Sequence, residues 1–241
     1  MLEDRPLVER AVHQIARGRG YLVQQSRDEH AGRKYFLTYV SARGTRDHVE
    51  VDLNFLQRVP LRVPSTRMLW QPTGSDQPVA NTVSLEEICA GKLCALLDRS
   101  MPRVLYDAAR LPTLANEVLK SYSFRGIFVA MAAVMKHPMH AYGRDRLERV
   151  TGEDVRDQLH PMLSRSDRPE ASELKDEAWR VVAPLLTLTE SERQFTDLIQ
   201  RGEFAPELLF PDEPEMVDRL RRHPALLWKA KNARDHAKKQ R

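Results

Sequence analysis

The spacing of apolar residues changes after Val83, and this change constrains the fold more than any other feature of the sequence. Before it, residues 21–25, 34–41 and 48–56 have the short apolar character of strands, and a turn-rich stretch joins the last two into an antiparallel hairpin. Beyond it, apolar residues recur at helical spacing almost to the C-terminus. The sequence therefore predicts an α+β fold, in which a small mixed or antiparallel sheet with flanking helices precedes an α-helical C-terminal domain.

The composition is that of a globular protein without a membrane span. Hydrophobic residues make up 41% of the 241-residue chain, which is enough for a sizeable core. The longest apolar run, residues 127–135, is far shorter than the roughly 18 residues that indicate a transmembrane helix. Acids and arginines occupy the start of the chain, where a secretory signal would be apolar. We expect a cytoplasmic protein with no membrane contact.

The C-terminal segment is basic. The formal net charge of the whole chain is only +4, but Lys and Arg between Arg219 and Arg241 far outnumber the single acid, Asp235. Contacts from such side chains to phosphates give an affinity for nucleic acid that is independent of base sequence and weakens with salt. The charge of this segment therefore suits tRNA or another nucleic acid, and a solvated basic surface is the alternative.

Two carboxylates alternate along the third predicted strand. Glu50 and Asp52 are two residues apart, and side chains at such positions project from the same face of a strand. The apolar residues between and around them take the opposite face. The two carboxylates therefore project together, and the alternative reading is an amphipathic strand that turns its charged face to water.

A lysine lies among the apolar positions of the predicted helix 84–99. Lys92 falls inside the arc of residues that should be buried, and Arg99 returns to almost the same angle. A lysine at the edge of a core often extends to solvent, but a Lys and an Arg in one row also suit phosphate oxygens. On the next helix, Arg103 and Asp107 are spaced to form a surface ion pair or to orient the lysine.

Several stretches together resemble the AbiEii/AbiGii toxin-type nucleotidyltransferases, which have a polymerase-β-like fold and include toxins of type IV toxin–antitoxin pairs. The stretches are residues 30–39, 49–61, 85–111 and 206–236. The third is the most specific, because the family pattern there is K-L-x-A-L-x-x-R followed by R-D-x-[YF]-D. In this chain the pattern is filled by Lys92, Arg99, Arg103, Tyr106 and Asp107, while Val104 stands where the family usually has Asp.

The resemblance implies an enzyme that binds a nucleoside triphosphate with Mg²⁺ and transfers the nucleotidyl group to an acceptor, in some relatives the 3′ end of tRNA. It also implies an antitoxin protein as a partner. Residues 1–111 would form the nucleotidyltransferase-like core and residues 112–241 a helical domain.

The same resemblance assigns a role to each candidate site residue. Asp52, with Glu50 as the competing choice, would bind the metal or accept the proton of the attacking hydroxyl. Lys92 and Arg99 would contact the triphosphate. Asp107 would orient Lys92 or the substrate, and Arg103 would hold its helix and add to the substrate contacts.

The chain departs from the family pattern in one respect. It contains neither the G-G-[TS] turn nor the D-x-D strand that the family places before the segments described above. It therefore looks like a family member without its first few dozen residues, and we expect impaired or absent transfer activity. A sheet that lacks its central strands would expose an apolar face and favour self-association. The alternative function is a non-catalytic module that binds nucleic acid or a partner protein.

Overall fold

The structure is a computed structural model that describes residues 4–26, 32–72 and 76–239. The chain divides into two compact units. The first comprises Met1–Val59 with His223–Ala225, and the second comprises Pro60–Arg222 with Leu226–Arg241. The functional division proposed from the sequence, after residue 111, stays a prediction.

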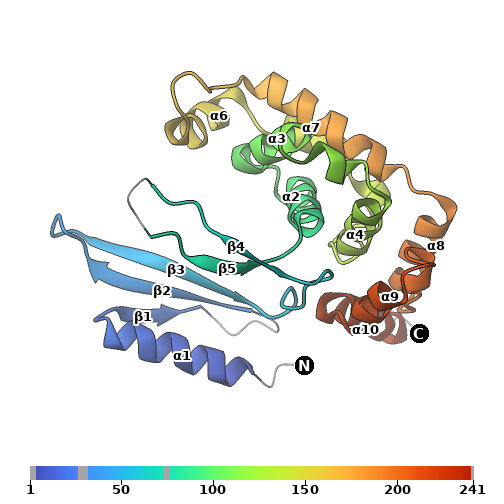
Figure 1. Cartoon of the computed structure of the whole chain (residues 1–241), viewed down its shortest axis with the longest axis horizontal. Coiled ribbons are helices and arrows are strands. Elements are labelled where there is room, and N and C mark those ends of the chain that lie inside the picture. The colour runs from blue at the N-terminus through green and yellow to red at the C-terminus, as the bar shows by residue number, and fades with distance from the viewer. Residues whose placement is uncertain (1–3, 27–31, 73–75, 240–241) are drawn as a thin grey trace. The chain divides into compact units, whose positions relative to one another are not determined.

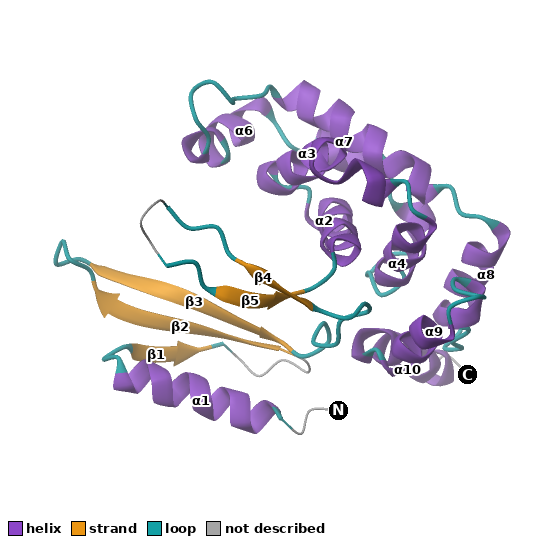
Figure 2. Ribbon diagram, in the orientation of Figure 1, coloured by secondary structure: helices purple, strands orange, loops and turns teal. Residues whose placement is uncertain are grey.

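The first unit is a helix and a three-stranded antiparallel sheet (Figures 1 and 2). Helix α1 (Arg5–Gly18) is followed by strands β1 (Leu22–Gln25), β2 (Gly32–Val40) and β3 (Arg46–Asn54), in the order β1-β2-β3. The hairpin predicted from the sequence is β2–β3, and each of its strands begins and ends within two residues of the prediction.

Helix α1 packs on one face of this sheet. Tyr35 of β2 is buried there, and the His13 ring meets its ring edge-on at a centroid distance of 5.4 Å. An ion pair of 3.1 Å between Glu9 and Arg33 adds a polar contact. Because side chains alternate along a strand, the neighbours Lys34 and Phe36 project from the other face. The face that α1 leaves open in this unit carries Lys34, Glu50 and Asp52.

The second unit begins with a small hairpin and continues as helices. Strands β4 (Ser65–Met68) and β5 (Val79–Thr82) form a separate two-stranded antiparallel sheet in a stretch whose prolines predicted an edge strand or irregular chain. The helical elements that follow are α2 (Leu85–Arg99), α3 (Pro102–Leu119), α4 (Tyr122–Ala132), η1 (Met139–Ala141), α5 (Asp145–Glu148), α6 (Gly152–Gln158), η2 (His160–Met162), α7 (Ala171–Leu186), α8 (Glu190–Gln200), η3 (Pro206–Leu208), α9 (Pro214–Arg222) and α10 (Pro224–Lys239). Within the described ranges, no helix is both long enough and apolar enough to span a bilayer. The predicted α+β class is confirmed.

Helix α2 is central to the second unit. It packs against α3 and α4, and α3 packs in turn against α7 (Figure 1). Ser84 caps its N-terminus by accepting a hydrogen bond of 3.2 Å from the Glu87 N–H. The Glu87 carboxylate accepts hydrogen bonds from the backbone N–H groups of Leu61 (2.8 Å) and Arg62 (2.9 Å). Glu87 therefore fixes the chain that leads into β4 as well as the start of α2.

Helix α3 contains a kink that the sequence predicts as a break. Pro112 lies inside the helix and has no N–H to donate to the preceding turn, and Ala115 has non-helical angles of φ −147° and ψ 32°. The sequence suggests one helix before this point and another after it. The kink allows both segments to remain on the same hydrophobic core, to which Leu111 and Ala115 contribute.

Gly91 and Gly126 offer a matched test of packing around α2 and α4. A Cβ atom at Gly91 would lie 3.7 Å from Met131 Cε, an ordinary van der Waals distance. A Cβ at Gly126 would lie only 2.5 Å from Phe210 Cζ. Because alanine favours a helix over glycine, we expect Gly91→Ala to raise the free energy of unfolding by about 0.5–1 kcal/mol.

Gly126→Ala should instead lower that free energy by about 1–3 kcal/mol, because the buried Phe210 ring must shift to admit the methyl group. Urea unfolding followed by circular dichroism measures both changes. If Gly91→Ala were as destabilising as Gly126→Ala, the packing described for α2 would be wrong.

Candidate functional site

The two carboxylates predicted on β3 share one cation. The register of the sheet pairs Lys34 of β2 with Asp52 and Phe36 with Glu50, so both carboxylates lie on the face opposite α1. Lys34 Nζ donates a hydrogen bond of 2.8 Å to Glu50 Oε2 and lies 3.6 Å from Asp52 Oδ2. The structure therefore brings Glu50 and Asp52 together around the ammonium group of Lys34.

The charges of this group affect one another. The hydrogen bond from Lys34 lowers the pKa of Glu50, and the same hydrogen bond, together with the charge of Asp52, raises the pKa of Lys34. His48 Nε2 lies 3.7 Å from the other oxygen of Glu50. All of these side chains are well exposed, so solvent screens their interactions. The formal charges of Glu50, Asp52 and Lys34 sum to −1.

The donors on β3 are of the kind that Mg²⁺ prefers. Because one ammonium lies within 4 Å of both carboxylates, their oxygens already converge on a position for a cation. Within the described ranges, no third His, Cys, Asp or Glu joins them to form a metal-ligating cluster. Mg²⁺ in proteins commonly takes one or two carboxylates and completes its shell with water and substrate phosphates. Glu50 and Asp52 fit that type of site and do not fit a closed protein cage.

Lys92 lies on an exposed face of α2, which corrects the expectation of a buried position. Leu85 and Ile88, predicted to belong to the same buried stripe, are 42% and 40% exposed. The buried residues of α2 are Cys89, Ala90, Leu93, Leu96 and Leu97. Lys92 therefore lies at the edge of the buried stripe, where the surface of α2 is exposed.

Lys92 is held by Asp107 of the neighbouring helix. Its Nζ donates a hydrogen bond of 2.5 Å to Asp107 Oδ2, which joins α2 to α3. Of the two pairings that the sequence left open for Asp107, the structure shows the one with Lys92 and not the one with Arg103. The carboxylate orients the ammonium and still leaves it accessible to a ligand.

Two further cations accompany this pair. Arg99 near the end of α2 and Arg103 near the start of α3 are exposed, and neither makes a hydrogen bond or ion pair with the residues that the structure describes. Within the described residues Arg103 therefore has no ion pair or side-chain hydrogen bond that would hold its helix, and substrate binding stays its predicted role. Free guanidinium groups near an oriented lysine suit an anion with several oxygens, such as a triphosphate.

Tyr106 has a structural partner that the sequence does not reveal. Its hydroxyl donates a hydrogen bond of 2.8 Å to Asp167, and it accepts one of 3.0 Å from Arg110. These contacts fasten the loop before α7 to α3, next to Asp107. No short-range pattern relates Asp167 to Tyr106, because 61 residues separate them. The sequence pattern also does not reveal that Lys34 lies opposite Asp52. This position follows once the register of the hairpin is known.

The candidate residues thus form two groups, one in each compact unit. Glu50 and Asp52 belong to the first unit, and the Lys92–Asp107 pair with its two arginines belongs to the second. That both groups act on one ligand stays a prediction.

Comparisons with known proteins give a family match over most of the chain. The family model described as nucleotidyl transferase AbiEii toxin, type IV TA system, matches residues 3–201. Among solved structures, the chain is similar to MenT4, a nucleotidyltransferase toxin from Mycobacterium tuberculosis H37Rv, with 16% sequence identity and a TM-score of 0.45. That similarity covers 83% of this chain and 66% of MenT4, just under two thirds of its length. No curated protein sequence matches the chain.

Proposed function

The chain belongs to the AbiEii family of nucleotidyl transferase toxins of type IV toxin–antitoxin systems, and we propose that it binds a nucleoside triphosphate with Mg²⁺ for transfer of the nucleotidyl group. The observation that carries this proposal is the Lys92–Asp107 pair on the exposed side of α2. Lys92 would contact triphosphate oxygens while Asp107 keeps it in place. Arg99 and Arg103 would take up further negative charge on the phosphates.

Glu50 and Asp52 are the residues that would hold Mg²⁺. When bound, the ion would neutralise charge on the triphosphate. In the transfer itself, the acceptor hydroxyl oxygen forms a bond to the α-phosphorus, the bond from that phosphorus to pyrophosphate breaks, and the hydroxyl proton passes to a carboxylate of β3. Asp52 is the proposed proton acceptor, with Glu50 as the competing choice.

We further propose RNA, with the 3′ end of tRNA as the first candidate, as the acceptor, and an antitoxin protein as a partner. The 241 residues contain no G-G-[TS] turn and no D-x-D pair, so we expect transfer by this chain to be slow or absent while nucleotide binding is retained. Because nucleoside triphosphates and RNA meet in the cytoplasm, that compartment stays the predicted location. Self-association of the chain also stays a prediction.

Two measurements on the full chain test this proposal. Titration calorimetry with each nucleoside triphosphate and Mg²⁺ should give saturable binding of at least one nucleotide. Incubation with an α-labelled triphosphate and tRNA should then show whether label reaches the RNA. Slow labelling, or binding without labelling, agrees with the proposal. If no nucleotide binds to the chain, the proposal is contradicted.

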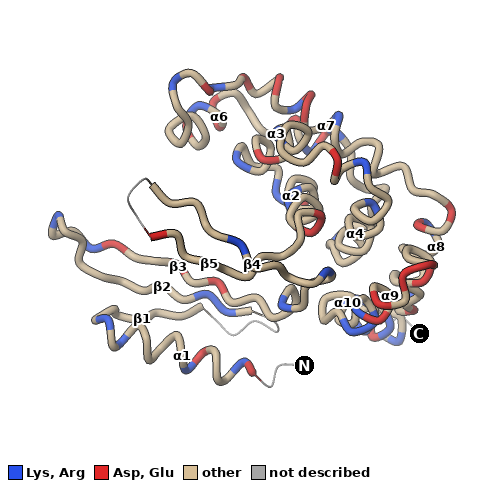
Figure 3. Tube along the Cα trace, viewed as in Figure 1, with Lys and Arg blue, Asp and Glu red and all other residues tan. Residues whose placement is uncertain are grey.

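The basic surface of α10 favours a second candidate function, a module that binds RNA without catalysis. Figure 3 shows Lys and Arg positions along α10. By helical spacing Lys231, Arg234 and Lys238 lie on one side of this helix; they are exposed and have no acidic partner within the described part of the chain. Such a row provides phosphate contacts that need no nucleotide site.

Replacement of all three side chains by Gln should weaken RNA binding and reduce the slope of log affinity against log salt by about 2, somewhat less than one for each phosphate that these side chains would neutralise. Filter binding at several salt concentrations gives this slope. A matched variant with Lys136, Arg149 and Arg156 replaced by Gln changes the net charge equally and should retain the slope. Equal reductions in both variants would mean that α10 has no special role.

A further inference from the structure

The position of Lys34 has a consequence for any ligand that carries a divalent cation. Its ammonium lies between Glu50 and Asp52 and already neutralises part of their charge. It also lies 6.0 Å from the centre of the Phe36 ring, so an aromatic face and two carboxylates surround it. An ammonium and a divalent cation cannot both occupy the space between the same oxygens.

Backbone hydrogen bonds hold Lys34 in place, so a change of partner would involve its side chain alone. The Lys34 N–H donates a hydrogen bond of 3.1 Å to Ser26 Oγ, and the Lys34 carbonyl accepts one of 2.8 Å from the Ser26 N–H. On the neighbouring strand β3, Asp52 pairs with Lys34 and Glu50 pairs with Phe36. Four rotatable bonds in an exposed lysine side chain allow the ammonium to move by several ångströms from this anchored position.

We infer that Lys34 is the resident counter-ion of the Glu50–Asp52 pair and exchanges its partners when nucleotide binds, leaving the carboxylates to the metal ion and turning to the phosphates. This inference rests on the proposed function. It assigns Lys34 two opposite effects. Lys34 competes with a free divalent cation for the carboxylates, but it contributes to the binding of the metal–nucleotide complex.

A lysine in an ordinary surface ion pair would not affect metal affinity and nucleotide affinity in opposite directions. Loss of Lys34 changes the local charge of the group from about −1 to −2, which favours any cation. The same loss removes the charge-assisted hydrogen bond that Lys34 donates to a phosphate in the proposed complex. The two affinities should therefore change in opposite directions, and this difference in sign is the test.

The experiment uses the full chain with Mn²⁺ as the probe. Electron paramagnetic resonance of free Mn²⁺ gives the affinity for the metal alone, and titration calorimetry gives the affinity for the Mg²⁺–nucleotide complex. For Lys34→Met we expect Mn²⁺ to bind about tenfold more tightly and the nucleotide complex to bind about tenfold more weakly. Lys34→Gln should behave in the same way and provides a second variant if the first does not fold.

Two controls make the result specific. Lys34→Arg keeps the positive charge and, unlike the two neutral variants, should bind Mn²⁺ with the affinity of the wild type. Arg58→Met removes a cation that lies 3.9 Å from Asp4 in the same unit, and it should change neither affinity.

Unchanged or weaker Mn²⁺ binding in both neutral Lys34 variants would overturn the inference, and so would a nucleotide affinity that does not fall. Failure of the wild type to bind any nucleotide would count against the proposed function, whereas the Mn²⁺ measurement would still decide whether Lys34 is the counter-ion.

Discussion

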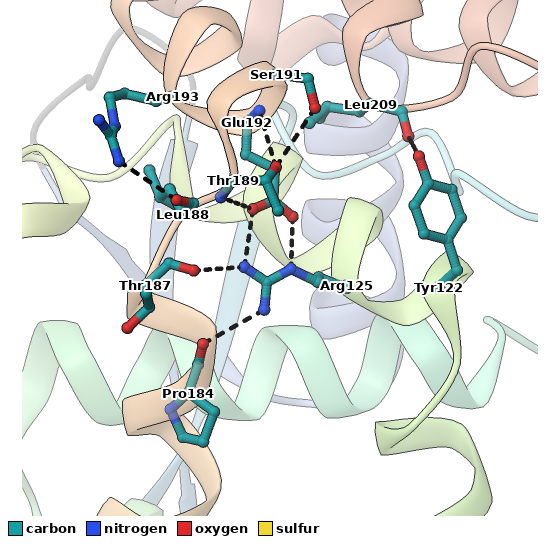
Figure 4. A network of polar contacts seen from close by, with 10 residues as sticks. All are labelled: Tyr122, Arg125, Pro184, Thr187, Leu188, Thr189, Ser191, Glu192, Arg193 and Leu209. Atoms are coloured by element: carbon teal, nitrogen blue, oxygen red, sulfur yellow. Dashed lines mark hydrogen bonds and ion pairs between the residues drawn. The ribbon is translucent and has the colours of Figure 1, made fainter.

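Replacement of Arg125 by leucine is expected to lower the free energy of unfolding by about 3–5 kcal/mol, the largest stability loss that we predict for this chain. Arg125 of α4 donates hydrogen bonds to both oxygens of Glu192, at 2.6 and 2.8 Å (Figure 4). The Glu192 side chain is only 8% exposed. Without Arg125, this buried carboxylate would lose its counter-ion, and the cost of leaving it unpaired explains the size of the effect.

The same arginine joins three helices. Its guanidinium also donates to the backbone carbonyls of Thr187 (2.7 Å) and Pro184 (3.3 Å) at the end of α7. Glu192 accepts a hydrogen bond of 2.7 Å from the N–H of Thr189, the residue that caps α8. Figure 4 shows these contacts converging on the turn between α7 and α8. The loss of Arg125 should therefore loosen this turn as well as expose an unpaired charge.

The effect should depend on pH with a defined sign. Burial by itself raises the pKa of Glu192, but hydrogen bonds from Arg125 and Thr189 outweigh it, so the net pKa is lowered. A carboxyl whose pKa is lowered by folding adds stability above its unfolded pKa, and that stability is lost as the pH falls through the folded pKa. The difference between wild type and Arg125→Leu should thus be largest near neutral pH and shrink in acid.

Chemical unfolding at several pH values measures this difference. Arg144 provides the control, because it also contacts two carboxylates, Glu148 and Asp176, but all three side chains are about half exposed. Arg144→Leu should cost about 1 kcal/mol or less. Replacement of Arg125 and Glu192 together by leucine should recover part of the loss. Equal costs for Arg125→Leu and Arg144→Leu would contradict the account of this buried pair.

Replacement of Lys92 by methionine should weaken Mg²⁺–nucleotide binding by about ten- to a hundredfold, the value of one charge-assisted hydrogen bond of about 1.5–3 kcal/mol. Stability should change by about 1 kcal/mol or less, because Lys92 and Asp107 form an exposed pair. Loss of binding with a retained fold distinguishes a ligand contact from a structural one. Titration calorimetry and urea unfolding on the same samples give both quantities.

Two further variants sharpen the result for Lys92. Asp107→Asn leaves the ammonium in place but without its orienting charge, so it should weaken binding by a smaller factor than Lys92→Met. Lys120→Met removes a lysine that pairs with Glu117 further along α3 and should leave nucleotide affinity unchanged. If Lys92→Met bound nucleotide as well as the Lys120 control, the phosphate role of Lys92 would be refuted.

The fold follows largely from local sequence signals. Ser84 predicts the start of α2, the alternation around Val51 predicts β3, and Pro112 predicts the interruption of α3. Each of these signals depends on residues that are close together in the sequence, because helix capping, strand alternation and proline geometry are local properties of the backbone. The Glu87 carboxylate, by contrast, has distant partners in the backbone N–H groups of Leu61 and Arg62. Such long-range hydrogen bonds have no local pattern.

The site is less predictable than the fold for the same reason. The shared face of Glu50 and Asp52 follows from the period of a strand, but their neutralisation by Lys34 depends on the register of the hairpin. Helical spacing placed Lys92 in a buried stripe, and most of that stripe is buried, but its edge with Leu85, Ile88 and Lys92 is exposed. Tertiary packing therefore decided which residues became accessible, and an amphipathic pattern alone does not contain that choice.

The central claim is that a metal–nucleotide complex binds at the Lys92–Asp107 pair, and paramagnetic broadening by a Mn²⁺–nucleotide complex tests it most directly. With the full ¹⁵N-labelled chain, one equivalent of the complex should broaden the amide signals of α2 around Lys92 and of α3 around Asp107. The diamagnetic Mg²⁺ complex, which should leave these signals sharp, is the control. If the signals around Lys92 and Asp107 stayed sharp with the Mn²⁺ complex, the claim would be contradicted.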